Sequence, residues 1–469
     1  MKTSSSVAAA EPLDAQEPFD LIVIGAGGAG EAAAHLASGR GARVAIVDRG
    51  LFGGSCPFWA CMPSKALLHA ASVHAHGGEY PWSKASAFRD YMINREGTDT
   101  PDDGGHVRSL EGARVAVIRG EARLAGPGRV SIAGADGSEH ELSSRSVIVA
   151  VGSYSTVPEL PGLEEAGYWT NVQGTSTRDL PESIVILGAG PTGAEMAQVY
   201  ARYGVPVTMV HSRDRILHHD HSKSSALVAA ALERDGVTIR TGVKATSVMP
   251  APVQGGKHRI CLSDGTSVEG HQIMLSIGRS YPMEGLNLAT IGVDGTQRLV
   301  PDEKLRIAPN VYVAGDVAGP EMHTHLAHYQ GEMAARIALG EDVVPDHSAI
   351  PRGLYTEPEI ASVGVQLEQA REAGIDAEEF SLDLAHTAKG YTAEAEGHVT
   401  IVVDRRARRL AGAFIGGPGA AEAIHEAVLA IKTGTSLDVL ADTIHAFPTV
   451  ARVLGTAFVQ AAREIPVPV

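Results

Sequence analysis

The chain of 469 residues is poor in several features that mark common classes of protein. It has only 3 cysteines, too few for the disulfide framework of a small secreted protein. It has no lysine- and arginine-rich run, and its net charge of −16 argues against a nucleic-acid partner. No apolar stretch reaches transmembrane length, so we expect no membrane partner. A globular protein of about three domains is expected.

The opening segment, residues 1–18, is rich in serine and alanine and carries acidic residues. It lacks a basic region followed by an apolar core, which a secretory signal would need. We therefore expect a disordered tail there and a cytoplasmic location for the protein.

A glycine-rich turn follows a short apolar run over residues 19–24 that predicts a buried strand. An alanine-rich helix and a second strand over residues 42–47 come next, and this strand ends at Asp48. Glycines in the turn allow a tight bend, close approach of a pyrophosphate and close helix packing, while the acid can bind a ribose hydroxyl. Strand, turn, helix, strand and acid together predict a dinucleotide-binding unit. Its glycines are Gly25, Gly27 and Gly30.

The same pattern recurs after a strand predicted over residues 184–187, with Gly188, Gly190 and Gly193 in the turn. The following strand, residues 205–210, ends in His211 and not in an acid, and Arg213 and Arg215 come next. Basic groups suit a 2′-phosphate, so this unit favours NADPH over NADH. The alternative is that the arginines belong to a solvated loop.

Two cysteines, Cys56 and Cys61, lie just beyond the first unit. On a regular helix, residues five apart lie about 140° apart around the axis and roughly 7.5 Å along it. Their Cα atoms would be roughly 8–9 Å apart, beyond the ~7 Å limit for a disulfide. A disulfide therefore requires a bent or irregular segment, and Pro57 and Pro63 supply breaks of that kind.

The position of this pair beside a nucleotide-binding turn favours a dithiol that exchanges electrons with a bound cofactor. The alternatives are zinc or two unconnected buried thiols. Zinc requires three or four ligands, and the remaining Cys261 stands alone in a strand-like run over residues 259–262. No metal site is predicted.

These motifs, in this order, resemble those of the flavin-dependent pyridine nucleotide–disulfide oxidoreductases, such as dihydrolipoamide dehydrogenase, glutathione reductase and mercuric reductase. The resemblance covers Phe19 to Arg463. It includes the run from Cys56 to Lys65 and four further motifs: Ala150-Val151-Gly152-Ser153, Ile277-Gly278-Arg279, Ala314-Gly315-Asp316 and Tyr355-Thr356-Glu357-Pro358-Glu359.

The resemblance implies an α/β fold with two Rossmann-like domains, one for FAD and one for NAD(P), and a C-terminal α+β dimerisation domain. The expected bounds are 19–158 and 283–347 for the two segments of the FAD domain, 159–282 for the NAD(P) domain and 348–469 for the dimerisation domain. It also implies a homodimer whose active site is shared across the interface.

The resemblance implies a role for each residue that matches a position in the family's motifs. Cys61 matches the charge-transfer thiol against the flavin, and Cys56 matches the interchange thiol that faces the substrate. Lys65 and Glu195 match the ion pair beside flavin N5, and Asp316 matches the ribityl ligand. In the family, hydride passes from NAD(P)H to FAD and then to the disulfide. The other expected cofactor contacts are Gly53, Ser55, Gly152, Ser153, Gly278, Arg279, Leu326, Ala327 and His328.

The chain departs from the family near its end. The family's last motif, from the partner subunit, places a histidine as acid/base for the interchange thiol and a glutamate that orients it. Here Phe447 and Arg452 occupy these two positions. A thiol of pKa near 8.5 is only about 3% thiolate at pH 7, and a positioned acid/base contributes roughly 10²–10⁴-fold. Exchange with lipoamide- or glutathione-like substrates should therefore be handicapped.

Two other residues bear on this loss. His445 is a possible substitute base, although a structural role is the favoured interpretation. Arg452 could bind an anionic substrate or stabilise a thiolate, or form a surface salt bridge.

One family branch, 2-ketopropyl-coenzyme M oxidoreductase/carboxylase, resembles the chain in carrying phenylalanine at the position of Phe447. In it, a proton-excluding pocket protects a carbanion. Phe58, Trp59 and Phe447 could form such a pocket, or simply pack.

The leading hypothesis is an FAD-dependent NAD(P)H oxidoreductase that acts through the Cys56–Cys61 disulfide on a small thiol, disulfide or thioether. The alternatives are reductive C–S cleavage or carboxylase-type chemistry, a quinone reductase of the diaphorase type, and a non-catalytic scaffold subunit. The intact cofactor and dithiol motifs disfavour the scaffold.

Overall fold

The computed structural model describes residues 17–296 and 298–467. Nearly all of the predicted tail, residues 1–18, therefore lies outside the described residues. The chain divides into two compact units. The first combines Met1–Cys61, Ile93–Tyr154 and Arg279–Pro345, and the second combines Met62–Met92, Ser155–Gly278 and Asp346–Val469. Each unit is described separately below.

An 8-stranded sheet forms the centre of the first unit, in the order β16-β17-β6-β1-β2-β3, with β4 and β5 attached beside β6. Neighbours from β17 to β3 run parallel, whereas β16, β4 and β5 pair in antiparallel fashion. The strands are β1 Phe19–Ile24, β2 Val44–Asp48, β3 Ala116–Arg119, β4 Glu121–Leu124, β5 Arg129–Ala133, β6 Glu139–Val149, β16 Arg306–Ala308 and β17 Val311–Val313.

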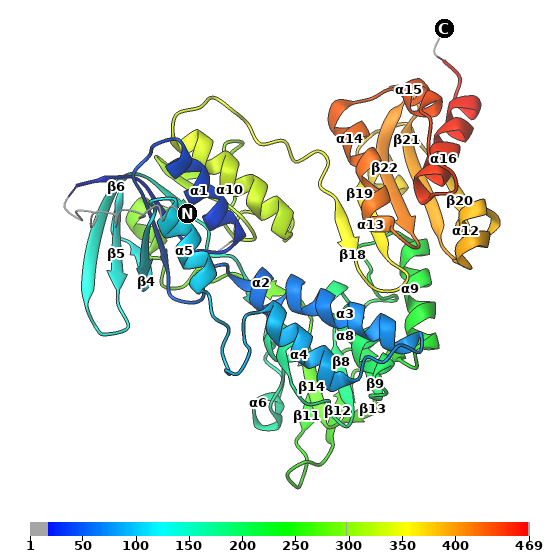
Figure 1. Ribbon diagram of the computed structural model, residues 1–469, viewed down its shortest axis with the longest axis horizontal. Helices are drawn as coiled ribbons and strands as arrows, with labels where there is room; N and C mark the ends of the chain where they lie inside the picture. The colour runs from blue at the N-terminus through cyan, green and yellow to red at the C-terminus, as the bar shows by residue number, and fades with distance from the viewer. Residues whose placement is uncertain (1–16, 297, 468–469) are drawn as a thin grey trace, which may run out of the picture. The chain divides into compact units, whose positions relative to one another are not determined.

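Helices α1 (Gly28–Gly39) and α10 (Thr324–Ala338) pack together and share a core with β1 and β2 (Figure 1). They approach closely because Gly331 of α10 meets the backbone of α1 at Ala29, where any side chain would collide with a carbonyl oxygen. Helix α5 (Gly104–Gly112) packs beside α1. The strands β4 to β6 and residues 286–299 contribute to a second core, which contains the other side chains of β1 and β2.

The second unit contains a parallel sheet in the order β10-β9-β8-β14. Helices α3, α4, α8 and α9 share one core with this sheet, and an antiparallel sheet, β11-β12-β13, shares another. The strands are β8 Ile184–Leu187, β9 Val207–Val210, β10 Thr238–Arg240, β11 Ala245–Met249, β12 His258–Leu262, β13 Ser267–Gly270 and β14 Gln272–Leu275. The helices are α3 Cys61–Ala75, α4 Trp82–Met92, α8 Pro191–Arg202 and α9 Ser222–Arg234.

The C-terminal part of this unit is an antiparallel sheet in the order β18-β19-β22-β21-β20, with helices α13 to α16 in its core (Figure 1). The strands are β18 Arg352–Leu354, β19 Ile360–Gly364, β20 Ala377–Asp383, β21 His398–Asp404 and β22 Arg409–Gly416. The helices are α11 Leu367–Glu372, α12 Ala388–Ala393, α13 Ala420–Ala423, α14 His425–Thr433, α15 Leu437–Asp442 and α16 Val450–Glu464. Short elements elsewhere are α2 Ser55–Trp59, α6 Leu163–Ala166, α7 Asn171–Ser176, β7 Tyr154–Ser155 and β15 Arg279–Ser280.

The predicted α/β architecture is confirmed, with parallel sheets behind both glycine-rich turns and an α+β C-terminal part. The strands over residues 19–24 and 184–187 have the predicted bounds, those predicted over 42–47 and 205–210 begin two residues late, and the strand-like run over 259–262 begins one residue early. The two compact units have different residue bounds from the predicted domains. Residues 62–92 pack with the second unit, because α3 and α4 bury their apolar faces against its parallel sheet.

Candidate functional site

The two thiols lie where one helix ends and another begins. Helix α2 ends at Trp59, Ala60 adopts non-helical angles (φ −135°, ψ −96°), and α3 begins at Cys61. The predicted irregularity is present, but it falls at Ala60 and not at the prolines. Pro57 and Pro63 lie in the first turns of α2 and α3, where a missing N–H costs no helical hydrogen bond.

This break brings the sulfur atoms together. Cys56 and Cys61 are not joined by a disulfide in the structure, and a side-chain hydrogen bond with Cys61 is the largest influence on the pKa of the Cys56 thiol. The Thr324 hydroxyl lies 3.3 Å from Cys61 Sγ and also hydrogen-bonds Cys56. The bond from Cys61 and burial raise the pKa of the Cys56 thiol far above its ordinary value. Cys56 therefore stays protonated in this dithiol arrangement.

The loop before the thiols is held tightly against the first glycine-rich turn. Gly53 and Gly54 both have positive φ, of 103° and 71°. A Cβ on Gly54 would lie 2.7 Å from the Cα of Gly27, and one on Gly53 would lie 2.8 Å from the His106 ring. Only glycine permits this backbone path, which leads into Ser55, the first residue of α2.

The first glycine-rich turn has the geometry of a pyrophosphate cradle. Gly25 has φ +102° and packs against Ala150, and a side chain on Gly30 would strike the Gly25 carbonyl oxygen. Gly27, by contrast, has only the Gly54 Cα near its Cβ direction, at 3.9 Å, so the backbone there is open to a close ligand.

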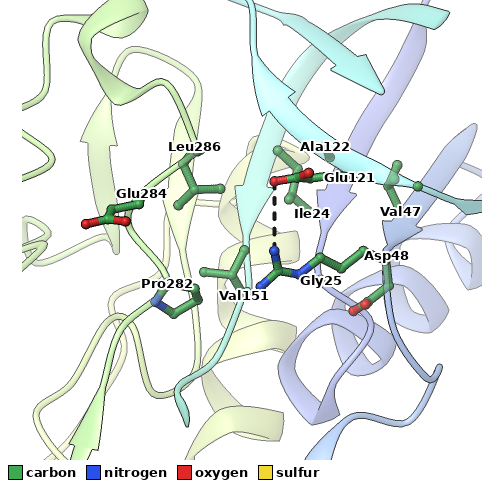
Figure 2. A pocket seen from close by; sticks show the side chains of 13 residues that line it. Ile24, Gly25, Val47, Asp48, Glu121, Ala122, Val151, Pro282, Glu284 and Leu286 are labelled. Atoms are coloured by element: carbon green, nitrogen blue, oxygen red, sulfur yellow. Dashed lines mark ion pairs between the residues drawn. The ribbon is translucent and has the colours of Figure 1, made fainter. Parts of the chain in front are cut away.

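A hollow open to solvent lies at the carboxyl ends of β1 and β2 (Figure 2). Asp48 lines it, and its carboxylate accepts hydrogen bonds of 2.7 Å from the backbone N–H groups of Ala26 and Gly50. These bonds fix the side chain and leave acceptor capacity for a ribose. The cradle and hollow therefore fit the adenosine diphosphate part of a dinucleotide such as FAD.

Three polar residues predicted to contact the cofactor meet in the first unit. Arg279 donates to the Ser153 hydroxyl at 2.5 Å, and its guanidinium lies 3.6 Å from the Asp316 carboxylate. Ser153 also hydrogen-bonds Asp316. Asp316 follows β17, and Gly152 precedes Ser153 with φ +66°. The structure thus brings together residues from three distant motifs.

The segment from His325 to His328 lies at the start of helix α10, which begins at Thr324 with His323 as its N-cap. Leu326 is buried, and the His328 ring packs against Gly28, where a Cβ would lie 2.6 Å from it. His328 is therefore a contact between α10 and α1.

The second cradle repeats the first. Gly188 has φ +104°, and a Cβ on Gly193 would lie 2.6 Å from the Gly188 oxygen. Gly190 has nothing within 4 Å of its Cβ direction. Gly278, with φ +140°, follows β14. This geometry fits a second dinucleotide, with the open Gly190 facing the pyrophosphate.

The basic residues after β9 are used in different ways. Arg215 donates to the carbonyl oxygens of Leu217 and His218, at 3.1 and 2.9 Å, so it shapes the loop. Arg213 is exposed. Within the described residues, His211 Nε2 is buried without a hydrogen-bond partner. Burial, and then Arg213, lower the pKa of His211, so the ring is neutral at pH 7.

Lys65 and Glu195 form an ion pair in the second unit. The Lys65 ammonium lies 2.9 Å from both oxygens of Glu195, which is buried on α8. The Tyr355 backbone N–H donates to the same carboxylate at 3.2 Å, and the Tyr355 ring centroid lies 4.7 Å from the ammonium.

The C-terminal segment has no acid/base at the position of Phe447, whose side chain is 73% exposed. His445 lies inward, with Nε2 2.9 Å from Glu426 and Nδ1 2.9 Å from the Thr443 carbonyl oxygen. Both ring nitrogens of His445 therefore have oxygen partners within the second unit. Arg452 is exposed on the first turn of α16.

Phe58 is a buried residue of the first unit. It is 1% exposed, and its ring packs edge-on against His106 at 5.6 Å. His106 in turn binds Glu31 of α1 at 2.9 Å. Thr324 and His106 were not among the predicted residues, because only the fold brings them to the thiols and to the loop before them.

Among residues 17–296 and 298–467, no group of three or more histidine, cysteine or acidic side chains is arranged to hold a metal. In the same part of the chain, no helix combines the length and apolar character needed to span a bilayer.

Two dinucleotide cradles and a hydrogen-bonded pair of thiols define a class of protein: a disulfide reductase that uses two dinucleotides. A family model described as pyridine nucleotide-disulphide oxidoreductase matches residues 19–331, and the dimerisation domain of that family matches residues 350–458. The chain belongs to this family. Members of the family use FAD and take electrons from NAD(P)H.

Similar proteins agree with this assignment. A dihydrolipoyl dehydrogenase of Thermus scotoductus is 33% identical over 459 residues, which cover 94% of this chain and 96% of that protein. A mercuric reductase of Streptomyces lividans is 31% identical, covering 95% and 96%. The structure of LpdA from Mycobacterium tuberculosis superimposes with a TM-score of 0.83 at 26% identity, covering 94% and 99%.

Proposed function

We propose that the chain is an FAD-dependent NAD(P)H oxidoreductase that reduces the Cys56–Cys61 disulfide and passes the electrons to a small thiol, disulfide or thioether. The observation that carries this proposal is the pair of thiols, hydrogen-bonded to each other at the break between α2 and α3. Bound FAD would supply the two-electron relay between a nicotinamide and the disulfide.

The chain's own residues would divide the remaining work. The Thr324 hydroxyl, at the first turn of α10, is a hydrogen-bond partner of both sulfur atoms, and its bond to Cys56 lowers the pKa of that thiol. The protonated Cys56 is the thiol that exchanges with substrate and must lose its proton first. With Phe447 at the position of the family's base, that proton leaves slowly unless the substrate itself accepts it.

The test is an anaerobic titration with NADPH. The proposal expects a long-wavelength charge-transfer absorption after two-electron reduction, and its loss in Cys61→Ser. Absence of that absorption in the wild type would refute the role of Cys61. A quinone reductase of the diaphorase type would instead keep full turnover in Cys56→Ser.

We also propose NADPH as the preferred donor. The exposed Arg213 offers a cation after β9. Arg213→Glu should raise the KM for NADPH about tenfold or more and leave that for NADH little changed. Arg215→Met, which removes loop contacts, should affect both nucleotides equally. If Arg213→Glu also changed the KM values for NADPH and NADH equally, that result would contradict the preference for NADPH.

We further propose a homodimer in which the exposed Phe447 segment of one protomer completes the site of the other, as the family resemblance implies. The matched dimerisation domain supports this arrangement. Mixing Cys56→Ser protomers with Phe447→Asp protomers should restore activity in the heterodimer. No recovery would contradict a shared site.

A further inference from the structure

The segment Thr356–Pro358 fixes the position of Tyr355, the residue directly before it, which contacts the Lys65–Glu195 ion pair. The Tyr355 backbone N–H donates to the Glu195 carboxylate at 3.2 Å. The Glu195 carboxylate is only 6% exposed, so this amide and the Lys65 ammonium are important partners for a buried charge. The position of the Tyr355 backbone therefore affects the geometry of the pair.

Gln198, which lies on the same helix as Glu195, forms hydrogen bonds with this segment. It lies three residues after Glu195 on α8, which places the two side chains on one face. Its Oε1 accepts from the Glu357 N–H at 2.7 Å, and its Nε2 donates to the Glu357 carbonyl oxygen at 2.9 Å. A side chain that is 1% exposed thus pairs with both backbone groups of one residue.

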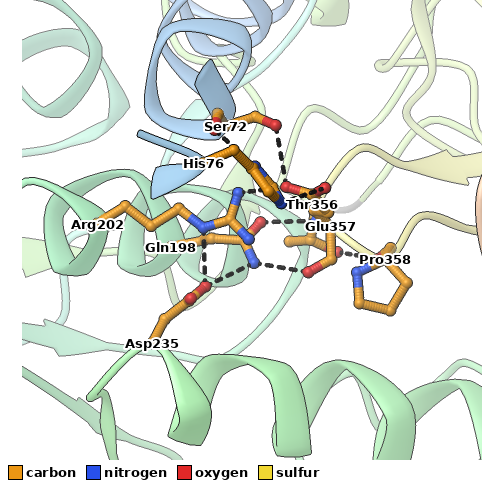
Figure 3. A network of polar contacts seen from close by, with 8 residues as sticks. All are labelled: Ser72, His76, Gln198, Arg202, Asp235, Thr356, Glu357 and Pro358. Carbon is orange, nitrogen blue, oxygen red and sulfur yellow. Dashed lines mark hydrogen bonds and ion pairs between the residues drawn. The ribbon is translucent and has the colours of Figure 1, made fainter. Parts of the chain in front are cut away.

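Further contacts hold Glu357 from its side chain (Figure 3). Arg202, one turn further along α8, binds the Glu357 carboxylate at 2.6 Å and Asp235 at 3.0 Å. Ser72 of α3 donates to the same carboxylate at 3.0 Å. Gln198 itself also donates to Asp235 at 3.0 Å. Glu357 is therefore fixed relative to α8 by backbone and side chain together.

The geometry points to Gln198 as a positioning residue for the Lys65–Glu195 pair. It fixes the Glu357 backbone, and through it the Tyr355 amide that binds Glu195. This inference rests on the proposed function and on the position beside flavin N5 that the family resemblance implies for the ion pair. Without the Gln198 amide, the Glu357 N–H and carbonyl group would be left unpaired, and the segment would shift toward water. Glu195 would then lose the Tyr355 hydrogen bond.

The experiment uses the holoenzyme with Gln198→Met, which preserves side-chain length without polar groups. Hydrogen exchange of the peptide spanning residues 352–359 should become at least tenfold faster. The flavin midpoint potential should shift, and NADPH should reduce the flavin at least tenfold more slowly. Normal exchange with an unchanged potential would overturn the inference. Gln198→Glu, which keeps the acceptor but not the donor, should give intermediate values and covers a failure of the first variant to fold.

A double-mutant cycle separates positioning from general destabilisation. If Gln198 acts through the ion pair, Gln198→Met should cause less than a twofold change in flavin reduction in a Lys65→Met background. Equal slowing in both backgrounds would overturn the inference. Ser183→Ala is the matched control, since it removes a buried hydrogen bond to His271 in the same unit, 2.8 Å long. It should leave exchange at residues 352–359 and the potential unchanged.

The same cycle distinguishes failure of the proposed function from failure of the inference about Gln198. If Lys65→Met alone leaves flavin reduction unchanged, the proposed role of the ion pair is refuted. Hydrogen exchange at residues 352–359 still decides whether Gln198 holds the segment.

Discussion

Acid should destabilise the second unit through one buried histidine, His398. The side chain is 5% exposed on β21, with Nε2 2.9 Å from the Ser224 hydroxyl and Nδ1 2.9 Å from the Thr400 hydroxyl. Burial is the largest cause that lowers the pKa of His398, to about 3. His221 and Lys223 lower it further, whereas Glu379 and Asp383 act in the opposite sense.

The sign follows from proton uptake. An unfolded histidine has a pKa near 6.5. Between about pH 6.5 and 3, His398 therefore binds a proton in the unfolded chain but not in the folded chain. The contribution of His398 to stability is complete above pH 6.5 and is lost as the pH falls toward 3. Each unit of pH in this window removes about 1.4 kcal/mol. From pH 6.5 to 4.5 the loss is therefore about 3 kcal/mol.

The assay is thermal unfolding of wild type and His398→Gln across pH 4.5 to 7.5. The other titrating groups act in both proteins, so the difference between the two curves isolates His398. The wild-type midpoint should fall relative to the variant by roughly 5–10 °C between pH 6.5 and 4.5. Parallel curves for the two proteins would show that His398 does not resist protonation, and would refute the reasoning. Thr400→Val, which removes one hydrogen bond but no titrating group, should run parallel to wild type.

Three further predictions concern the candidate site. Thr324→Val removes the hydroxyl beside the thiols, so the pH at which the charge-transfer absorption appears should rise by about one unit; an unchanged titration would contradict the assigned hydrogen bond. Gly30→Ala should abolish flavin retention after gel filtration because the new methyl group meets a backbone oxygen, whereas Gly39→Ala, with nothing within 4 Å, should retain flavin fully. Phe447→His combined with Arg452→Glu should raise lipoamide or glutathione reductase activity roughly tenfold or more; no gain in a folded double variant would count against the acid/base argument.

The glycine-rich turns and the redox segment were predictable because their geometry is local. Positive φ angles at Gly25 and Gly188 follow from steric rules that act within one residue, and the sequence spacing reveals them. Similarly, the separation of Cys56 and Cys61 required a break in the helix. The sequence did not locate that break, since Ala60 shows no sign of it and the prolines occupy favourable first-turn positions.

Contacts between distant segments depended on the tertiary structure. Thr324 reaches Cys61 across 263 positions of sequence, and only the packing of α10 in the first unit brings it there. Gln198 and Glu357 are separated by 159 positions, and neither residue type indicates the other. The sequence by itself predicted two glycine-rich cradles, a pair of neighbouring cysteines and phenylalanine at the position of the family's base, because each is a short-range pattern. The fold alone decided which side chains surround the sulfur atoms and the ion pair, because chain topology sets those distances.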